Sequence, residues 1–389
     1  MMEISKNSYK YAHIFTVDSF LYNKSIQKLI CENYLSDEHI FIYLNEKSYS
    51  LVKDLKLGKT ILENSSCTVE LIRKALEIAD IVFIHNNGFS NTEIVKLTDA
   101  EANRLIWSVW GPDLYKNDNL RKKRNVFYKI LRFVYHLLRY KHVYTQNTIS
   151  RQVAEADLKI NKFRAICAGF EGDIVEIKKR YPDVTVFQAL YPGESSLHNI
   201  IPWENEVVND SHQKVRILLG HCALKFLQHK KWLKKLASEK DSIELYIPLN
   251  YGNKKYADKI EKLAKRLFGT SVICFKTPLT PKDYFIQVLA KVDMAIFDFE
   301  IQSAYGNALL LLYLGKKIFY PENSVMYKGL SENGACVFKL EEFDVRSFSN
   351  KFNNNNKTEE SIEFARKRLD INTYVNQWKS VFDFRRESE

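Results

Sequence analysis

Short apolar runs alternate with segments of helical periodicity in the first half of the chain. The runs are rich in β-branched and aromatic residues and end at turn residues, which predicts buried strands. The predicted strands are residues 11–17, 39–44, 81–85, 105–110 and 142–146. Helical spacing of apolar residues occurs between them, at residues 23–34 and 69–79. This alternation predicts an α/β domain.

The same alternation restarts after an irregular stretch at residues 194–210. It predicts strands at residues 215–220, 243–249, 271–275, 294–299 and 317–321. We therefore predict two Rossmann-like domains with parallel sheets, facing a cleft at the strand ends. The predicted boundaries are 1–205 for the first domain and 206–350 for the second. Residues 351–389 form a polar linker and a helix, near 361–382, that packs back toward the first domain.

Length and composition agree with this division. The chain has 389 residues, which exceeds what one core usually supports, and 46% of them are hydrophobic. The six cysteines are scattered without a C-x-x-C pair, so neither a zinc site nor a disulfide framework is indicated. The chain has no long apolar leader and no run long enough to span a membrane. We expect a cytoplasmic protein.

Positive charge is concentrated in one stretch of the first half. The net charge is +11, and residues 121–142 hold eight Lys or Arg and no acid, interleaved with apolar residues. This basic amphipathic pattern is typical of a helix lying on an anionic membrane. It also fits an ordinary domain helix with a solvated basic face. Nucleic-acid binding is disfavoured because no base-reading motif accompanies the charge.

An aspartate follows the predicted strand at residues 105–110. The sequence here is LIWSVWGPDLYK, so Gly111 and Pro112 end the strand and Asp113 comes directly after them. In an open α/β sheet, ligands lie beyond the carboxyl ends of the strands, which makes Asp113 a candidate site residue. The alternative is that Asp113 caps the next helix and the tryptophans are core.

Loops of the second half also follow strands. Gly220 allows close approach of a ligand to the backbone, and the next helix offers N–H groups to a phosphate. The loop is neither a P-loop nor a dinucleotide-binding G-x-G-x-x-G, which argues against kinases and dehydrogenases. A polar, glycine-containing turn, QSAYGN, precedes another apolar helix.

Together these segments resemble the bacterial N-acetylfucosaminyl (4-acetamido-4,6-dideoxygalactosyl) transferases of glycosyltransferase family 56, which act on lipid-linked intermediates in enterobacterial common antigen synthesis. The resemblance rests on HIFTVDSFLYN, IHNNGFSN, WGPDLY, LLGHCALK, IPLNYG and QSAYGNALLLLYLGKK. It implies a GT-B fold, with a nucleotide-sugar donor in the C-terminal half. The N-terminal half would meet a polyprenyl-diphosphate-linked glycan acceptor.

The candidate site residues fall into three groups. Asp18, Asp113 and His85 are candidates for the general base, since they follow or end strands of the first half. The acceptor-binding candidates are Asn23, Asn87, Trp110, Gly111 and Tyr115. The donor-binding candidates are Gly220, His221, Lys225, Pro248, Tyr251, Gln302, Tyr305, Gly306 and Asn307.

The chemistry expected at this site needs no metal. Backbone N–H groups and nearby basic residues would stabilise the departing diphosphate, and no D-x-D pair is present, although Asp298 and Glu300 form a weaker alternative. We expect no cofactor, and a dTDP- or UDP-linked sugar as co-substrate. We expect the enzyme on the inner face of the bacterial inner membrane, held peripherally through residues 121–142. The alternative function is an inactive glycan-lipid-binding or scaffold protein of the same fold.

Overall fold

The computed structural model describes residues 8–17, 19–55, 57–63, 65–116, 141–193, 196–207, 213–345 and 355–385. The chain forms two compact units. The first comprises Met1–Gly169, Asp173–Tyr191 and Gln377–Glu389, and the second comprises Phe170–Gly172 and Pro192–Asn376.

The first unit is built on a seven-stranded parallel sheet. Its strands are β1 (Tyr9–Phe15), β2 (His39–Tyr43), β3 (Lys59–Leu62), β4 (Ala79–His85), β5 (Leu105–Val109), β6 (Ala165–Ala168) and β7 (Thr185–Gln188). They lie in the order β3-β2-β1-β4-β5-β6-β7. Strands β2 and β5 are buried along their whole length, as expected for a parallel sheet covered on both faces.

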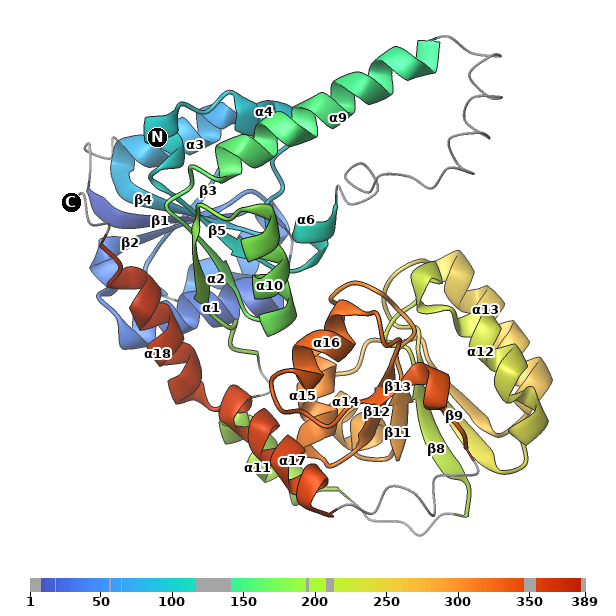
Figure 1. The fold of residues 1–389 in the computed structure, drawn as a ribbon. Coiled ribbons are helices and arrows are strands. Elements are labelled where there is room, and N and C mark those ends of the chain that lie inside the picture. The colour runs from blue at the N-terminus through green and yellow to red at the C-terminus, as the bar shows by residue number, and fades with distance from the viewer. Residues whose placement is uncertain are drawn as a thin grey trace. The chain divides into compact units, whose positions relative to one another are not determined.

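Helices connect the strands of this unit (Figure 1). They are α1 (Phe20–Asn33), α2 (Glu46–Val52), α3 (Val69–Ile78), α4 (Asn91–Val95), α5 (Asp99–Ala102), α6 (Pro112–Tyr115), α9 (Lys141–Ile160) and α10 (Glu171–Arg180). The end of α18 (Ile371–Phe382) also belongs to this unit. There the Trp378 side chain is fully buried, and the Tyr11 hydroxyl donates to the Phe382 carbonyl oxygen at 2.7 Å.

The second unit has a six-stranded parallel sheet. Its strands are β8 (Val215–Leu219), β9 (Ile243–Pro248), β10 (Val272–Phe275), β11 (Met294–Ile296), β12 (Lys317–Tyr320) and β13 (Phe338–Lys339), in the order β10-β9-β8-β11-β12-β13. Its helices are α11 (Leu197–Glu204), α12 (His229–Leu236), α13 (Lys254–Phe268), α14 (Pro281–Tyr284), α15 (Tyr305–Tyr313), α16 (Val325–Ser331), α17 (Asn355–Leu369) and the start of α18. The expectation of two α/β domains with parallel sheets is confirmed.

Both sheets reverse their strand order at one point. The reversal lies between β1 and β4 in the first unit and between β8 and β11 in the second. Ligands of open α/β sheets bind beyond the carboxyl ends of the strands at such a switch point. The loops after these four strands are therefore where a site is expected in each unit.

The structure differs from the predicted elements at residues 142–146 and 361–382. Residues 142–146 are not a strand, because they lie inside α9, whose buried residues Val153, Ala156 and Ile160 follow a helical spacing. The single helix predicted at 361–382 is two helices, since Asp370 interrupts it and its carboxylate accepts from the Asn372 backbone N–H at 3.0 Å. Of the basic stretch 121–142, residues 121–140 lie outside the described residues.

Candidate active site

Asp113 ties together two loops at the carboxyl edge of the first sheet. It lies in the first turn of α6 and is only 5% exposed. One carboxylate oxygen accepts from the Trp107 indole N–H at 2.7 Å and the Asn87 backbone N–H at 2.9 Å, and the other accepts from the Trp110 backbone N–H at 3.0 Å. The loops after β4 and β5 are thus fastened to one side chain.

These contacts bear on whether Asp113 is a site residue or the cap of the next helix. Burial raises its pKa, while the three hydrogen bonds oppose the rise by stabilising the charged form. The N-cap of α6 is Gly111, with φ 93°, so Asp113 is not the cap of that helix. A carboxylate that already accepts three hydrogen bonds is a poor proton acceptor for a substrate. The geometry favours a positioning role.

The loop after β4 is fixed by further contacts. Asn87 is buried, and its side-chain oxygen accepts from the Phe89 backbone N–H at 3.1 Å. The Lys116 ammonium donates to the carbonyl oxygens of Asn87 and Phe89 at 2.8 and 3.0 Å. Thr16 joins this loop to the loop after β1, since its hydroxyl oxygen accepts from the Gly88 N–H at 3.1 Å.

His85 belongs to a buried chain of three histidines. His13 Nδ1 lies 2.9 Å from His85 Nε2, and His13 Nε2 lies 2.9 Å from His39 Nδ1. The three rings come from the adjacent strands β1, β4 and β2 and are at most 2% exposed. Burial lowers the pKa of His85 to about 3, that of His39 to about 4, and that of His13 well below its usual range. All three are neutral at pH 7.

The histidine chain continues to a tyrosine at the carboxyl edge of the sheet. His85 Nδ1 is hydrogen-bonded to the Tyr191 hydroxyl, which donates to the Ser108 hydroxyl at 2.8 Å. Because a neutral imidazole has one donor and one acceptor, the Tyr191 bond sets the direction of every bond back to His39. Both ring nitrogens of His85 are occupied, so in this arrangement neither is presented to a substrate. No pattern in the sequence indicated this chain of histidines.

Two other residues predicted in the first unit, Asn23 and Trp110, lie at the same edge. The side chain of Asn23 is buried and donates to the Val17 carbonyl oxygen at 3.1 Å. Trp110 is half-buried, between Tyr22 and Tyr191. Tyr115 points elsewhere, because its hydroxyl donates to Asp173 at 2.6 Å, where burial raises the pKa of the Asp173 carboxyl to about 7. Asp18 lies outside the described residues.

Gly220 begins the loop after β8 in the second unit. Its φ of +69° suits glycine, and a Cβ there would lie 2.7 Å from His229 Nε2. Packing against His229 is therefore one reason why glycine is needed at position 220. The predicted close approach of a ligand is a second, separate reason. Gly306 differs, because a Cβ built on it meets nothing within 4 Å.

His221 lies in an aromatic cluster at the ends of β8 and β11. Its ring is near Tyr251, Phe297 and Phe299, with centroids 5.7 to 6.2 Å apart. Its Nε2 is 3.0 Å from the Ser303 hydroxyl, whereas its Nδ1 is buried without a hydrogen-bond partner among the described residues. Burial lowers its pKa to about 4, so the ring is neutral.

The remaining predicted donor residues differ in exposure. Tyr251 is 55% exposed, and its carbonyl oxygen accepts from the Ala223 backbone N–H at 2.8 Å, which joins the loops after β9 and β8. Pro248 ends β9 and is buried. Lys225 is exposed at the start of a short 3₁₀ turn, and Gln302 is half-buried before α15.

In the first turn of α15, Gly306 is exposed, whereas the side chains of Tyr305 and Asn307 are already hydrogen-bonded. The N-cap of α15, Ala304, has the left-handed φ of 55° and no side-chain cap bond. Gly306 is exposed, while Asn307 donates to the Tyr284 hydroxyl at 3.1 Å. Tyr305 is buried, and its hydroxyl donates to Glu171 at 3.3 Å.

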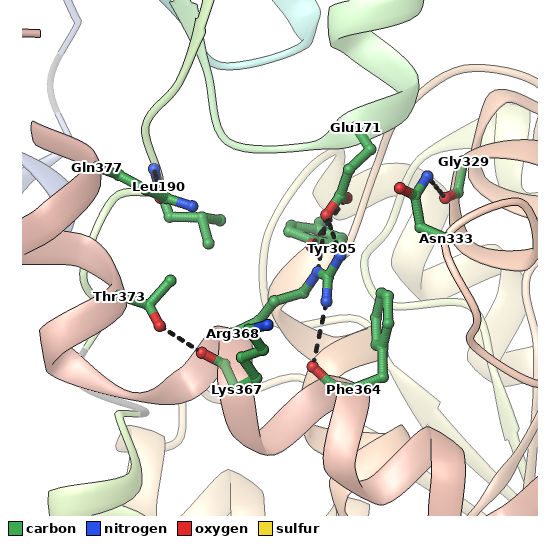
Figure 2. A network of polar contacts seen from close by, with 10 residues as sticks. All are labelled: Glu171, Leu190, Tyr305, Gly329, Asn333, Phe364, Lys367, Arg368, Thr373 and Gln377. Atoms are coloured by element: carbon green, nitrogen blue, oxygen red, sulfur yellow. Dashed lines mark hydrogen bonds and ion pairs between the residues drawn. The ribbon is translucent and has the colours of Figure 1, made fainter. Parts of the chain in front are cut away.

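Glu171 belongs to an ion pair within the second unit (Figure 2). The Arg368 guanidinium donates to it at 2.7 Å through Nε and again through Nη2. The same guanidinium lies 3.5 Å from the centre of the Phe364 ring. Tyr305 therefore connects the first turn of α15 to this ion pair through its hydroxyl.

The described residues offer neither a metal site nor a membrane span. Among them, no group of three or more His, Cys, Asp or Glu side chains is placed to hold a metal ion. Asp298, the weaker metal alternative, accepts from the Lys231 ammonium at 2.7 Å and the Trp232 indole at 2.8 Å. None of the described helices is long and apolar enough to cross a membrane.

Solved structures with the same architecture include glycosyltransferases. A glycosyltransferase from Rickettsia africae matches with a TM-score of 0.58 at 12% identity, over 97% of this chain and 98% of its own. The Anabaena protein HepE, solved with UDP, gives 0.61 at 11% identity over 96% and 99%. WaaG, a glycosyltransferase of lipopolysaccharide biosynthesis, gives 0.53 at 14% identity over 96% and 98%. The fold is that of the GT-B glycosyltransferases.

A family model makes the class more specific. The model for 4-alpha-L-fucosyltransferases, glycosyl transferase group 56, matches residues 137–383. The chain belongs to this family, as the sequence blocks indicated, and is a nucleotide-sugar-dependent glycosyltransferase. The match covers the second unit, which holds the predicted donor loops, and the later part of the first.

Proposed function

We propose that the enzyme transfers an N-acetylfucosamine-like deoxy-acetamido sugar from a dTDP- or UDP-linked donor to a polyprenyl-diphosphate-linked glycan. This reaction would serve the synthesis of a bacterial surface polysaccharide. The enzyme would work at the inner face of the inner membrane, bound peripherally. Family membership and the residue blocks shared with N-acetylfucosaminyl transferases support the choice of sugar.

One observation in the second unit carries the donor half of the proposal. Among the buried polar atoms that lack a hydrogen-bond partner within the described residues, three lie at this edge of the second sheet: His221 Nδ1, Asn250 Oδ1 and the Tyr320 hydroxyl. They come from the ends of β8, β9 and β12, and Phe297 and Phe299 lie beside both His221 and Tyr320. Unpaired buried polar atoms are costly, so a ligand with several donors and acceptors, such as a nucleotide, would stabilise this edge.

The diphosphate would lie at the first turn of α15. The N-terminal N–H groups of a helix bind anions, and the Ala304 N-cap supplies no side-chain acceptor to compete for them. The open space at Gly306 would allow the phosphate oxygens to come close to the backbone. When the glycosidic bond to the diphosphate breaks, negative charge grows on the leaving group, and these groups would stabilise it.

The acceptor would meet the first unit, where Asp113 and the loop after β4 fix the carboxyl edge. The acceptor hydroxyl must lose its proton as the new glycosidic bond forms. Asp113 and His85 are both engaged in the structure, so Asp18, which follows β1 in the sequence, is the base we propose. Trp110 and Asn23 are the acceptor contacts that this geometry supports best.

A direct assay tests the proposal. Purified enzyme is incubated with a panel of dTDP- and UDP-linked sugars and polyprenyl-diphosphate-linked glycans, and products are identified by mass spectrometry. Transfer of an N-acetylfucosamine-type sugar is expected. Excess dTDP or UDP should also raise the melting temperature. Nucleotide protection without any turnover would favour the inactive scaffold instead.

A further inference from the structure

Three aromatic side chains form a row at the carboxyl edge of the first unit. The rings of Tyr22 and Trp110 have centroids 5.4 Å apart, and those of Trp110 and Tyr191 lie 5.2 Å apart. They come from α1 and from the loops after β5 and β7. Tyr22 is 49% exposed, and the other two are half-buried. We call these three residues the aromatic row.

Contacts with neighbouring residues fix Tyr191 and Trp110, the two half-buried members of the row. The Tyr191 hydroxyl is hydrogen-bonded to His85 and Ser108, and its ring meets the edge of Trp378 at 5.8 Å. The backbone N–H of Trp110 donates to Asp113. A ring fixed in this way loses little conformational entropy when a ligand binds against it.

Two unpaired polar atoms accompany the row. The Trp110 indole N–H is buried. It lies near the Tyr191 hydroxyl, whose charged form it stabilises, but no hydrogen bond of ordinary geometry joins it to any described residue. Asn23, next to Tyr22 in the sequence, has a buried Oδ1 that likewise accepts none there. One atom is a donor and the other an acceptor, and a hydroxyl group can serve both roles. An aromatic surface beside an unpaired donor and acceptor suits a ligand with both an apolar face and hydroxyl groups.

We infer that the aromatic row binds a pyranose ring of the acceptor glycan. The C–H groups on one face of the sugar would pack on the Tyr22 and Trp110 rings, whose faces carry negative charge density. Sugar hydroxyls would accept from the Trp110 indole and donate to Asn23. A prenyl chain would bury the same rings but leave both polar atoms unpaired, which makes it the less suitable occupant. The inference rests on the proposed glycosyl transfer and adds Tyr22 and Tyr191 to its acceptor site.

Tyr22→Ala is the most direct variant, because Tyr22 is half exposed and its removal leaves the core intact. We expect kcat/KM for the lipid-linked glycan to fall about tenfold, in the range of one aromatic contact. Tyr22→Phe keeps the ring face and should recover most of that loss. The control is Leu35→Ala, because Leu35 is 64% exposed in the same unit and is not a member of the aromatic row. It should match the parent.

A second measurement needs no turnover. Binding of methyl glycosides of N-acetylhexosamines is followed by saturation-transfer NMR on the full-length protein, with undecaprenyl diphosphate lacking a glycan as the competing probe. Signals from the sugar ring that disappear in Tyr22→Ala support the row even if the proposed transfer is never detected. Normal transfer with an unchanged acceptor kcat/KM in Tyr22→Ala overturns the inference while the proposed function stands. Loss of binding of the glycan-free lipid alone also overturns it, in favour of a prenyl site.

Discussion

His13 Nδ1 lies 2.9 Å from His85 Nε2, and the two rings, on adjacent strands, are at most 1% exposed. Two imidazoles at this distance share one proton, and neither is charged, because burial holds the pKa of both below its usual value. His39 has the same property, with Lys10 and Asp37 as the charged groups facing it. This cluster makes the stability of the first unit depend on pH.

We predict that the free energy of unfolding decreases as the pH falls below about 6.5. The histidines have lower pKa values in the folded state than in the unfolded chain, so between about pH 6.5 and 4 the unfolded state binds more protons. Stability is therefore present above pH 6.5 and is lost on acidification. The slope is about 1.4 kcal/mol per pH unit for each such histidine. Urea denaturation at a series of pH values measures it.

His13→Phe isolates the contribution of the chain. The substitution leaves His85 Nε2 and His39 Nδ1 without their partner, so we expect the free energy of unfolding to fall by about 1–3 kcal/mol at pH 7. We also expect the free energy of unfolding to depend less steeply on pH below about 6.5. The matched control is His198→Phe, because His198 is exposed. Equal effects of the two substitutions would mean that the buried chain does not determine the acid response.

Asp113→Asn and Asp18→Asn should have different effects. In Asp113→Asn, the side-chain amide would offer one oxygen and an NH₂ group to the three N–H donors that now face the carboxylate, so we expect a lower melting temperature. Asp18→Asn should keep the parent melting temperature and reduce transfer about 100-fold if Asp18 is the base. Thermal melts and single-turnover rates are compared. A fully active Asp18→Asn would return the search for the base to Asp113 and His85.

Gly220→Val and Gly306→Val test the donor loops. At Gly220 a side chain would meet His229 with φ positive, so we expect loss of stability before any loss of nucleotide affinity can be measured. At Gly306 the side chain enters open space, so the protein should stay folded and bind dTDP or UDP at least about tenfold more weakly, because the side chain would keep the phosphate from the backbone. Calorimetry measures the binding. Parent-like affinity in a folded Gly306→Val would move the diphosphate away from α15.

The basic stretch at residues 121–142 is tested on vesicles. Neutralising Arg121, Lys122, Lys123 and Arg124 should weaken co-sedimentation with anionic vesicles, and added salt should weaken it in the parent. Neutral vesicles are the control. Equal binding to both kinds of vesicle would favour the alternative of an ordinary domain helix.

The strands that were predicted correctly have a strong local pattern. Residues 39–44 and 105–110 are continuous apolar runs, and they form β2 and β5 almost to the residue. Strands β3, β6, β7 and β13 were not predicted, and none of them is longer than four residues. Length alone is not the reason, because β10 and β12 also have four residues and were predicted. Residues 142–146 have a strand-like composition, but a longer helical period across α9 overrides it.

The site was only partly accessible to the same reasoning. A carboxylate after a strand, such as Asp113, is visible in the sequence, but its three donors depend on how the loops after β4 and β5 meet. The histidine chain depends on strand order, since His13 contacts His39 and His85 only because β1 lies between β2 and β4. The aromatic row likewise joins residues from three distant segments.

The return of Gln377–Glu389 to the first unit affects how this protein can be made and divided. Trp378 donates to the Leu190 carbonyl oxygen at 2.8 Å, and the Leu190 N–H donates to Gln377 at 2.9 Å, so this segment completes a core whose strands were synthesised much earlier. During translation, the first unit therefore cannot complete its core until residues 377–382 have been synthesised, after the second unit. A gene fragment ending before residue 377 would express a first unit with an open core, whereas a circular permutant could restore it.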